Sequence, residues 1–383
     1  MELYVHLPFC RQKCRYCDFA SFPGEEGRME AYVNALLREA EIRLPEVQEP
    51  LSTVYFGGGT PSLLPDFLLT RLVNGLKASL PMNTVQEWTV EANPGTVSSS
   101  WLETAAFLGI NRLSLGMQAA QDHLLHALGR IHCMKDVVDS IRMARAAGFI
   151  NLNLDLIFGL PGQSMSDWVE TLDRALDLDP AHVSAYGLIP EEGTPLWTDL
   201  KNGRIFLPEV EEEREMYDYL LRKLSSEGFR QYEISNFARN GYECVHNIGY
   251  WRQIPYLGLG LSAASMTGLV HSQDGLHYLR STNTRDMDGY IHGILAGYPV
   301  LEEKNIICPA DARFETMMLG LRMNSGVRSE EFKALHGCLP ESCFGDKLRM
   351  LTDRGLLQYQ NHSWQLTREG QDLQNTVLVE LMD

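Results

Sequence analysis

The stretch CRQKCRYC, residues 10–17, has the residue types and spacing best suited to chemistry. It places Cys10, Cys14 and Cys17 close together in a chain of 383 residues that contains eight cysteines. A structural zinc site uses four ligands, usually in two C-x2-C pairs, and no second pair lies near this one. A C-x3-C-x2-C loop instead suits a [4Fe-4S] cluster, because three thiolates leave one iron without a protein ligand. We predict such a cluster, and a zinc site completed by His6 is the alternative.

Short apolar runs that alternate with helical patterns set the architecture around this loop. The runs expected to be strands are LYVHL, TVYFGG, EWTVEAN, NRLSLGMQ, NLNLDLIFGL and HVSAYGLI. Helical patterns between them cover residues 29–44, 66–80, 97–108, 134–147 and 166–178. This repeat predicts an α/β fold with a parallel sheet, either open and doubly wound or closed into a partial (β/α)6 barrel. In both folds the C-terminal ends of the strands carry the chemistry, and the cysteine loop directly follows the first strand.

The pattern changes after about residue 195, so we expect three parts. Residues 1–195 form the β/α core, and residues 196–304 form an accessory region of aromatic- and glycine-rich pieces. Residues 305–383 contain short helical patterns and a possible hairpin, LLQYQNHSWQL, which together suggest a winged-helix-like α+β segment. Winged helices often bind DNA, but this part holds 8 Lys and Arg against 11 Asp and Glu. We therefore expect it to bind protein or ligand, or to be structural, and we expect no nucleic-acid partner.

The composition is that of an ordinary soluble globular protein, with 44% hydrophobic and 22% charged residues. The formal net charge of -17 disfavours unspecific attraction to nucleic acid or anionic lipid. The chain starts MELYVHLPFC, without a basic segment before an apolar one, and no apolar run reaches membrane-spanning length. We therefore expect a cytoplasmic protein. Outside the cysteine loop we expect buried or idle thiols at Cys133, Cys244, Cys308, Cys338 and Cys343.

The segments YVHLPFCRQKCRYCDF and GGGTPS together resemble the radical S-adenosylmethionine (SAM) superfamily. More specifically, they resemble its oxygen-independent coproporphyrinogen III oxidase-like family, and the likeness runs from Tyr4 to about Tyr256. The resemblance implies that the amino and carboxylate groups of SAM chelate the open iron. It also implies that an electron from the cluster cleaves the sulfonium and yields a 5'-deoxyadenosyl radical.

Residues that match the SAM contacts of this family lie mostly at predicted strand ends. Gly57, Gly58 and Gly59 end the second strand, where backbone carbonyls can approach an ammonium closely, although a glycine run alone predicts only a tight turn. Asp155 lies inside an apolar strand and needs a polar partner, either a ribose hydroxyl or an internal salt bridge. Arg130 matches the residue that binds the SAM carboxylate. The implied SAM site comprises Tyr4, Tyr16, Gly58, Gly59, Thr60, Glu91, Gln118, Arg130, Asp155 and Ile189, with core packing as the alternative role of Tyr4, Tyr16 and Ile189.

Two departures from the decarboxylating oxidases narrow the resemblance. Those enzymes have a fourth cysteine two residues after the third, where this sequence has Phe19. They also have an N-terminal extension of several dozen residues, whereas this chain reaches its cluster motif at residue 10. The segment HNIGYW instead matches the H-N-x-x-Y-W signature of the haem chaperone (HemW-type) subgroup, whose members lack the oxidase activity and bind haem for delivery.

The HNIGYW residues have side chains that suit haem. His246 is a possible axial ligand, Asn247 can fix its tautomer or a propionate, and Tyr250 and Trp251 offer flat apolar area. Without the resemblance, a His-Asn pair before two aromatic residues more often marks a capped turn. The segment after the motif reads GLGLSAASM, where the family usually has Gly-Ala-His, so His271 and His277 are further candidates for the axial ligand.

These observations predict a radical SAM-fold haem chaperone that binds a [4Fe-4S] cluster, SAM and haem. Its expected partners are haem and a haem-acceptor protein, with peripheral contact to haem proteins of the membrane. An enzyme that decarboxylates coproporphyrinogen III, or acts on another tetrapyrrole, is the main alternative because the SAM contacts are retained. An iron-sulfur protein that never cleaves SAM is a third hypothesis.

Overall fold

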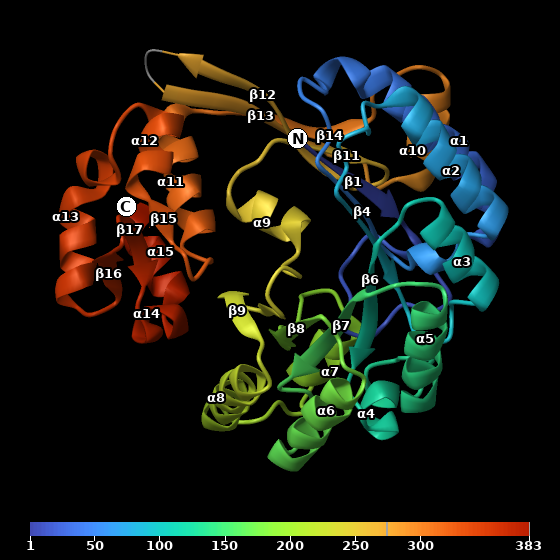
Figure 1. Ribbon diagram of the computed structural model, residues 1–383, viewed down its shortest axis with the longest axis horizontal. Coiled ribbons are helices and arrows are strands. Elements are labelled where there is room, and N and C mark those ends of the chain that lie inside the picture. The colour runs from blue at the N-terminus through green and yellow to red at the C-terminus, as the bar shows by residue number, and fades with distance from the viewer. Residues whose placement is uncertain (273–274, 383) are drawn as a thin grey trace.

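Six parallel strands form the centre of the protein, which a computed structural model describes over residues 1–272 and 275–382 (Figure 1). They lie next to one another in chain order, as in a barrel and unlike a doubly wound sheet. The α/β fold with a partial (β/α)6 barrel is therefore confirmed. The strands are β1 (Glu2–Leu7), β4 (Thr53–Gly58), β5 (Glu87–Ala92), β6 (Arg112–Gln118), β7 (Asn151–Phe158) and β8 (His182–Gly187).

Helices follow these strands and cover the outer face of the sheet (Figure 1). Each of the five predicted helices begins and ends within two residues of its expected bounds. Serines at two of the starts explain the bounds, because Ser98 accepts a hydrogen bond from the Trp101 backbone and Ser164 accepts one from Asp167. The helices are α1 (Met29–Arg43), α2 (Asp66–Ser79), α3 (Ser99–Phe107), α4 (Asp122–Ala127), α5 (Met134–Ala146) and α6 (Met165–Asp177), with 3-10 turns η1 (Glu26–Arg28), η2 (Leu44–Glu46) and η3 (Pro61–Leu63).

Side chains of the barrel strands alternate between an apolar outer face and a polar inner face. On β1, Leu3, Val5 and Leu7 belong to the main hydrophobic core beneath the helices. The intervening Tyr4 and His6 face the barrel interior, where they contact each other and other polar side chains. The helices are therefore held by apolar burial, while buried polar groups inside the barrel need partners of their own.

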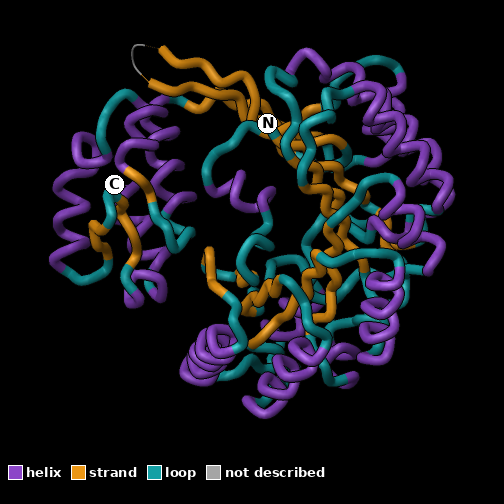
Figure 2. The backbone as a smooth tube through the Cα atoms, viewed as in Figure 1, coloured by secondary structure: helices purple, strands orange, loops and turns teal. Residues whose placement is uncertain are grey.

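The accessory region extends the barrel sheet at both edges (Figure 2). One part adds strands beside β8, and another adds β11 parallel to β1 and then an antiparallel meander. The full sheet has twelve strands in the order β14-β13-β12-β11-β1-β4-β5-β6-β7-β8-β10-β9. The added elements are α7 (Pro195–Lys201), α8 (Val210–Ser226), β9 (Arg230–Glu233), β10 (Asn236–Ala238), α9 (Val245–Trp251), β11 (Tyr256–Leu259), β12 (Ala264–Ser272), β13 (Gly275–Asn283), α10 (Met287–Leu295) and β14 (Leu301–Ile307).

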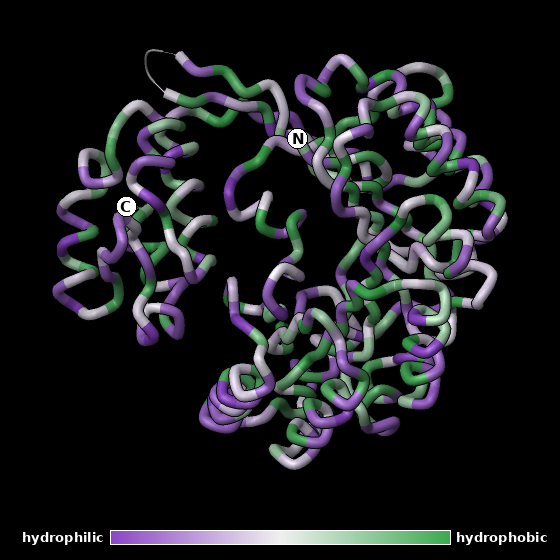
Figure 3. Tube along the Cα trace, in the orientation of Figure 1, coloured by the Kyte–Doolittle hydropathy of each residue, from purple (hydrophilic) through white to green (hydrophobic). Residues whose placement is uncertain are grey.

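The C-terminal segment folds around a hydrophobic core of its own, which includes Phe332, Leu348 and Trp364. Figure 3 shows apolar stretches both here and in the barrel. The expected hairpin is present, and β15 joins it as a third strand. The elements are α11 (Pro309–Gly320), β15 (Val327–Arg328), α12 (Ser329–His336), α13 (Pro340–Asp353), β16 (Leu357–Gln360), β17 (Ser363–Leu366), α14 (Arg368–Asp372) and α15 (Gln374–Met382). Over the described residues, no helix has the length and apolar character to cross a membrane.

A candidate cofactor site at the C-terminal ends of the barrel strands

The cysteine loop lies between two short paired strands, β2 (Phe9–Cys10) and β3 (Phe22–Pro23). The loop is also fixed from outside, because the Arg15 backbone N–H donates to the Leu128 carbonyl at 2.9 Å. Cys10 is buried, Cys14 and Cys17 are half-buried, and all three are free thiols. They line one cavity of about 360 Å³. Burial raises the pKa of Cys10 and Cys17 above the ordinary thiol value, so these thiols are protonated until a metal displaces the proton.

The donor set fits an iron-sulfur cluster better than a single zinc ion. Among the described residues, no group of three His, Cys, Asp or Glu side chains is placed to hold one metal ion. The expected zinc alternative needs His6, but its Nδ1 lies 3.0 Å from the Tyr4 hydroxyl and its Nε2 lies 2.8 Å from the Ala20 carbonyl. A cubane holds its thiolates further apart than one ion does, since different irons bind them. Three thiols that line one cavity, without a fourth ligand placed beside them for a single ion, therefore agree with the predicted cluster.

The glycines at the end of β4 allow its backbone to approach β1. Gly58 has φ +110°, and a Cβ there would lie 2.5 Å from the His6 ring. A Cβ on Gly59 would lie 2.6 Å from the Phe9 carbonyl. The Thr60 backbone N–H then donates to that carbonyl at 2.7 Å. The glycine run is thus needed to bring the strand end against the cysteine loop, which sequence alone does not show.

Glu91, at the end of β5, faces this strand end across the cavity floor. Its Oε1 accepts a hydrogen bond from the Tyr55 hydroxyl at 2.8 Å, and its Oε2 accepts one from the Gly58 backbone N–H at 3.1 Å. Burial raises the pKa of Glu91 to about 7. A cation entering the cavity would favour the ionised carboxylate and lower that pKa again.

A chain of hydrogen bonds links Arg130 to the cysteine loop. Its Nη1 donates to Asn93 Oδ1 at 2.6 Å, and Asn93 Nδ2 donates to Thr60 Oγ1 at 2.8 Å. Thr60 Oγ1 in turn lies 3.5 Å from Cys10 Sγ. The other guanidinium nitrogen, Nη2, donates to the Tyr16 hydroxyl at 2.6 Å, while Nε is buried without a partner. An orphaned N–H on a buried guanidinium is the kind of group that an anionic ligand satisfies.

Asn93 was missed in the sequence, although a signal was present. It follows Glu91 by two residues in the stretch VEANP, directly after the third barrel strand. Polar side chains just beyond a parallel strand belong to the functional end of the sheet, so the strand-end rule applies to it equally. The rule also applies to Tyr186, near the end of β8, which lines the same cavity.

Asp155 and Gln118 occupy neighbouring strands on the far side of the cavity. Asp155 accepts hydrogen bonds from Ser114 Oγ and Asn153 Nδ2, both at 2.9 Å, and it makes no salt bridge with any of the residues that the structure describes. Burial raises its pKa above the usual carboxyl value. Gln118 has φ +65°, a left-handed conformation that is uncommon outside glycine. A strained residue at a strand end that lines a cavity is typical of a ligand site.

All the predicted cluster and SAM residues line this cavity except Thr60 and Tyr4. Thr60 lies just behind it in the chain of bonds described above. Tyr4 lies deeper in the barrel, stacked on Tyr55 with ring centroids 6.2 Å apart, so its packing role is the one visible. Ile189 is 71% exposed at the rim, where an apolar group can cover a ligand.

Comparison with known proteins identifies the family. Residues 4–175 match the model of the Radical SAM superfamily, and residues 307–373 match the HemN C-terminal domain. The chain is 36% identical to the Heme chaperone HemW of Bacillus subtilis, with 98% of this chain and 97% of that protein aligned. It is 34% identical to the Heme chaperone HemW of Escherichia coli over 99% and 97% of the two chains.

The chain belongs to the HemW family of radical SAM proteins. Membership of that superfamily implies a [4Fe-4S] cluster and SAM. A solved structure of coproporphyrinogen III oxidase (HemN) from Escherichia coli, described as a radical SAM enzyme, matches with a TM-score of 0.84 and 23% identity. The match covers 99% of this chain and 89% of the other, and at this identity it shows the shared fold.

The HNIGYW motif of this HemW-family chain forms α9, at the opposite end of the barrel interior from the cysteine loop. His246 is 1% exposed, with Nδ1 2.7 Å from Thr53 Oγ1 and Nε2 3.0 Å from the Tyr250 hydroxyl. Burial lowers its pKa to about 3. Because both ring nitrogens are bonded and the ring is covered, the imidazole is not free to ligate a haem iron in this arrangement. The sequence left open whether His246 binds haem or belongs to a structural turn, and the geometry favours the structural role.

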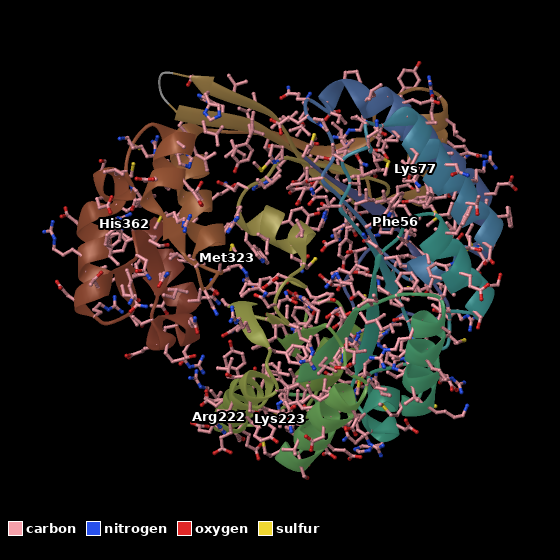
Figure 4. All side chains as sticks on the ribbon, viewed as in Figure 1. Phe56, Lys77, Arg222, Lys223, Met323 and His362 are labelled. Atoms are coloured by element: carbon pink, nitrogen blue, oxygen red, sulfur yellow. The ribbon has the colours of Figure 1, made fainter. Side chains whose placement is uncertain are left out.

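The rest of the motif packs between the barrel and the C-terminal segment. The Arg322 guanidinium lies 4.6 Å from the Trp251 ring centroid, and the indole Nε1 is buried without a partner. Next to Arg322, Met323 pairs its backbone with Glu233 of β9, and its side chain lies on the face of the C-terminal segment turned toward the barrel (Figure 4). Asn247 is half-buried on the same helix. The motif therefore contributes to holding two parts of this HemW-family protein together.

Phe19 is the last sequence-predicted feature of the site. It lines the cavity and is 63% exposed, so an aromatic ring lies at the mouth where the oxidases are expected to have a fourth cysteine. This HemW-family chain thus has a flat apolar surface there and no thiol.

Proposed function

We propose that this protein holds a [4Fe-4S] cluster on Cys10, Cys14 and Cys17, binds SAM beside it, and carries haem to an acceptor protein. The observation that supports the chaperone role most strongly is the similarity to proteins named Heme chaperone HemW along almost the whole chain, at 36% and 35% identity. Similarity confined to the barrel would not distinguish a chaperone from other radical SAM proteins.

The arrangement of the cavity supports SAM binding. Arg130 has an unpaired buried N–H and offers a charged fork for the carboxylate. Asp155 is held at 2.9 Å by Ser114 and Asn153, which leaves it oriented to accept from ribose hydroxyls. Glu91 and the glycine carbonyls can accept hydrogen bonds from the amino group, and they supply negative potential for the cationic sulfonium. A bound cluster would supply an open iron for the amino-acid end of SAM and a single electron.

For haem, we propose an axial ligand other than His246. The β12–β13 hairpin carries His271, which is exposed, and His277, whose Nε2 lies 3.1 Å from Ser272 Oγ at the surface. His271 pairs with Leu276 and His277 pairs with Val270, so the two imidazoles lie on opposite faces of the hairpin, and a haem approaching from solvent can meet either one without disturbing the barrel. His246, by contrast, would have to break bonds to Thr53 and Tyr250.

The acceptor is proposed to be a haem protein that receives its cofactor in the cytoplasm or at the membrane surface. The net charge of -17 makes binding to anionic lipid unfavourable, so contact with membrane haem proteins would be with the proteins themselves.

The second candidate function is oxidative decarboxylation of coproporphyrinogen III, favoured by the fold shared with HemN. Phe19 argues against this function. It stands at the cavity mouth where the oxidases have a cysteine, and a phenyl ring has no acid-base or redox chemistry.

The two functions are separated by one anaerobic experiment. Reconstituted protein is titrated with haem, and in parallel incubated with SAM, a reductant and coproporphyrinogen labelled in its propionate carboxyls. We expect a saturable haem spectrum at one haem per chain and no labelled CO₂. Release of label in amounts exceeding the enzyme would establish the oxidase instead.

The axial ligand is tested with His271→Ala, His277→Ala and the double variant, beside His246→Ala. We expect the double variant to shift the Soret band or lower haem affinity, while His246→Ala keeps the wild-type spectrum. The reverse result would show that α9 opens to bind haem.

A further inference from the structure

Two cysteines outside the cluster loop lie in contact in the C-terminal segment. Cys338 Sγ and Cys343 Sγ are 3.3 Å apart, and both thiols are free. The turn between α12 and α13 creates this contact. Gly337 ends α12 with φ +73°, and Pro340 starts α13, so the chain reverses within a few residues and places Cys343, in the first turn of α13, against Cys338.

The other cysteines outside the cluster loop have different neighbours. Cys133 and Cys308 donate to carboxylates three residues later, at 3.3 Å and 3.2 Å, and Cys244 donates to Glu87 at 3.5 Å inside the barrel. Cys343 is exposed and Cys338 is half-buried, so a small molecule can reach the pair from solvent. A reagent in solution can therefore reach this pair, whereas Cys244 is buried.

We propose that Cys338 and Cys343 are a redox-active dithiol that closes to an intramolecular disulfide when a low-molecular-weight disulfide oxidises the protein. One of the two thiols loses its proton to water, and its thiolate attacks a sulfur of the oxidant. The oxidant S–S bond breaks, one small thiolate leaves, and a mixed disulfide forms. The second cysteine, as thiolate, attacks the protein sulfur of that mixed disulfide and expels the other small thiolate. Two cysteine thiols are oxidised, and the oxidant is reduced to two thiols.

Geometry favours closure over a lasting mixed disulfide. The second sulfur is already in contact with the first, so the displacement step requires only a small movement of two side chains on a surface turn. Cys343 stands in the first turn of a helix, and Cys338 follows a glycine and packs only against the edge of the C-terminal core, so neither anchor lies in a strand.

A chain of hydrogen bonds connects the region of the dithiol to the residues that follow α9. His336, two residues before Cys338, is buried, and its Nε2 lies 2.7 Å from Thr316 Oγ1 on α11. Thr316 also donates to Gln253, which lies two residues beyond α9. A disulfide would fix the turn that starts directly after His336, the last residue of α12, and so would restrain the contact between the C-terminal segment and α9. The inference does not depend on haem or SAM binding.

The test uses the whole protein, reduced and then exposed anaerobically to oxidised glutathione, with free thiols blocked by N-ethylmaleimide before digestion. Trypsin should release residues 334–347, which contain both cysteines, since Lys333 and Lys347 flank them. We expect this peptide to be unblocked and lighter than the reduced form by two hydrogen atoms. A second cut by a Glu-specific protease at Glu341, between the cysteines, should give two fragments that separate only after reduction.

Matched controls distinguish closure from general oxidation. Cys308 should carry a glutathione adduct, because its neighbour is the Asp311 carboxylate and not a thiol. Cys343→Ser should trap the same adduct on Cys338. Hydrogen exchange across residues 334–347 should slow in the oxidised wild type and not in the variant. The proposal is overturned if wild-type Cys338 and Cys343 each carry glutathione, if both remain open to the blocking reagent while Cys308 is oxidised, or if the crosslink joins two chains.

Discussion

At the C-terminal ends of the barrel strands, buried polar groups face a cavity, whereas at the N-terminal ends they are bonded to α9. Arg130 keeps an unpaired Nε beside three free thiols. At the other end both oxygens of Glu87 accept backbone N–H groups at the start of α9, and His246 is bonded through both ring nitrogens. Both ends are polar, so inward-facing polarity alone does not mark a ligand site. A ligand site is marked instead by unpaired polar groups that converge on free space.

Cavity volume alone would favour a ligand site at the N-terminal ends of the strands. A hollow of about 530 Å³ lies at the N-terminal ends of the strands and is lined by loop residues such as Ile150 and Tyr242. It exceeds the cofactor cavity of about 360 Å³ but contains no thiol and no arginine. The smaller cavity is the better candidate because its lining has metal-ligand and anion-binding chemistry.

The largest expected effect is loss of the cluster from the C-terminal ends of the barrel strands, here called the open end because they face the cavity. Alanine at Cys10, Cys14 and Cys17 together should abolish binding of iron and sulfide, about four of each per chain in the wild type. The metal-free variant should unfold within about 1 kcal/mol of the metal-free wild type, since the thiols make only weak contacts, such as the one at 3.5 Å between Cys10 Sγ and Thr60 Oγ1. Iron, sulfide and zinc analysis after anaerobic purification checks this. Full iron loading of the triple variant, or stoichiometric zinc in the wild type, would contradict it.

The next effect tests the N-terminal ends of the strands, here called the closed end because their polar groups are bonded to α9. His246→Ala should lower the free energy of unfolding by about 3 kcal/mol, because it opens a cavity and removes the hydrogen bonds that His246 makes with Thr53 and Tyr250. Cluster content and SAM affinity should stay unchanged. Asn247→Ala is the matched control on the same helix and should cost less than about 1 kcal/mol. Denaturant unfolding measures both, and a His246→Ala protein as stable as wild type would show that the bonds of His246 within the barrel do not stabilise the fold.

The comparison also shows what the sequence could predict. The six barrel strands and five helices follow from local patterns. Glu91 and Gln118 follow from a strand-end rule combined with family resemblance, whereas Arg130, which lies between α4 and α5, follows from the resemblance. The position of His246 does not, because its partner Thr53 is 193 residues away and only the folded sheet brings them together. Likewise β11 joins β1 at the barrel edge through a pairing that no local pattern records.

Arg130 provides the next smaller effect, at the open end. Arg130→Ala should weaken SAM binding by about 2 kcal/mol, roughly 30-fold, because it removes a charge-assisted pair with the carboxylate. Arg130→Lys should recover part of the loss, since it restores the charge without the fork. The measurement is SAM titration of cluster-loaded protein, with iron content confirmed for each variant. Equal affinity in the alanine variant would remove Arg130 from the site.

The smallest expected effect is the pH dependence of SAM binding, which sharpens the comparison because it asks whether a buried carboxylate at the open end responds to a ligand. Burial raises the pKa of Glu91 to about 7, so the group is mostly ionised at pH 8 and mostly neutral at pH 6. The ionised form attracts the cationic ligand, so affinity should fall as pH falls, by at most about tenfold across this window.

The α-amino group of SAM titrates in the same range, so the slope for the wild type alone does not report Glu91. Glu91→Gln keeps the shape of the side chain but cannot ionise, and its profile contains only the contribution of the ligand. Dividing the wild-type affinity by that of Glu91→Gln at each pH isolates the carboxylate, and this ratio should rise from pH 6 to pH 8 with a midpoint near 7 or below. The midpoint shifts downward if bound SAM stabilises the charged form. A ratio that is flat with pH would mean that Glu91 keeps one protonation state throughout, and that its bonds to Tyr55 and Gly58 serve the barrel, as those of His246 do at the other end.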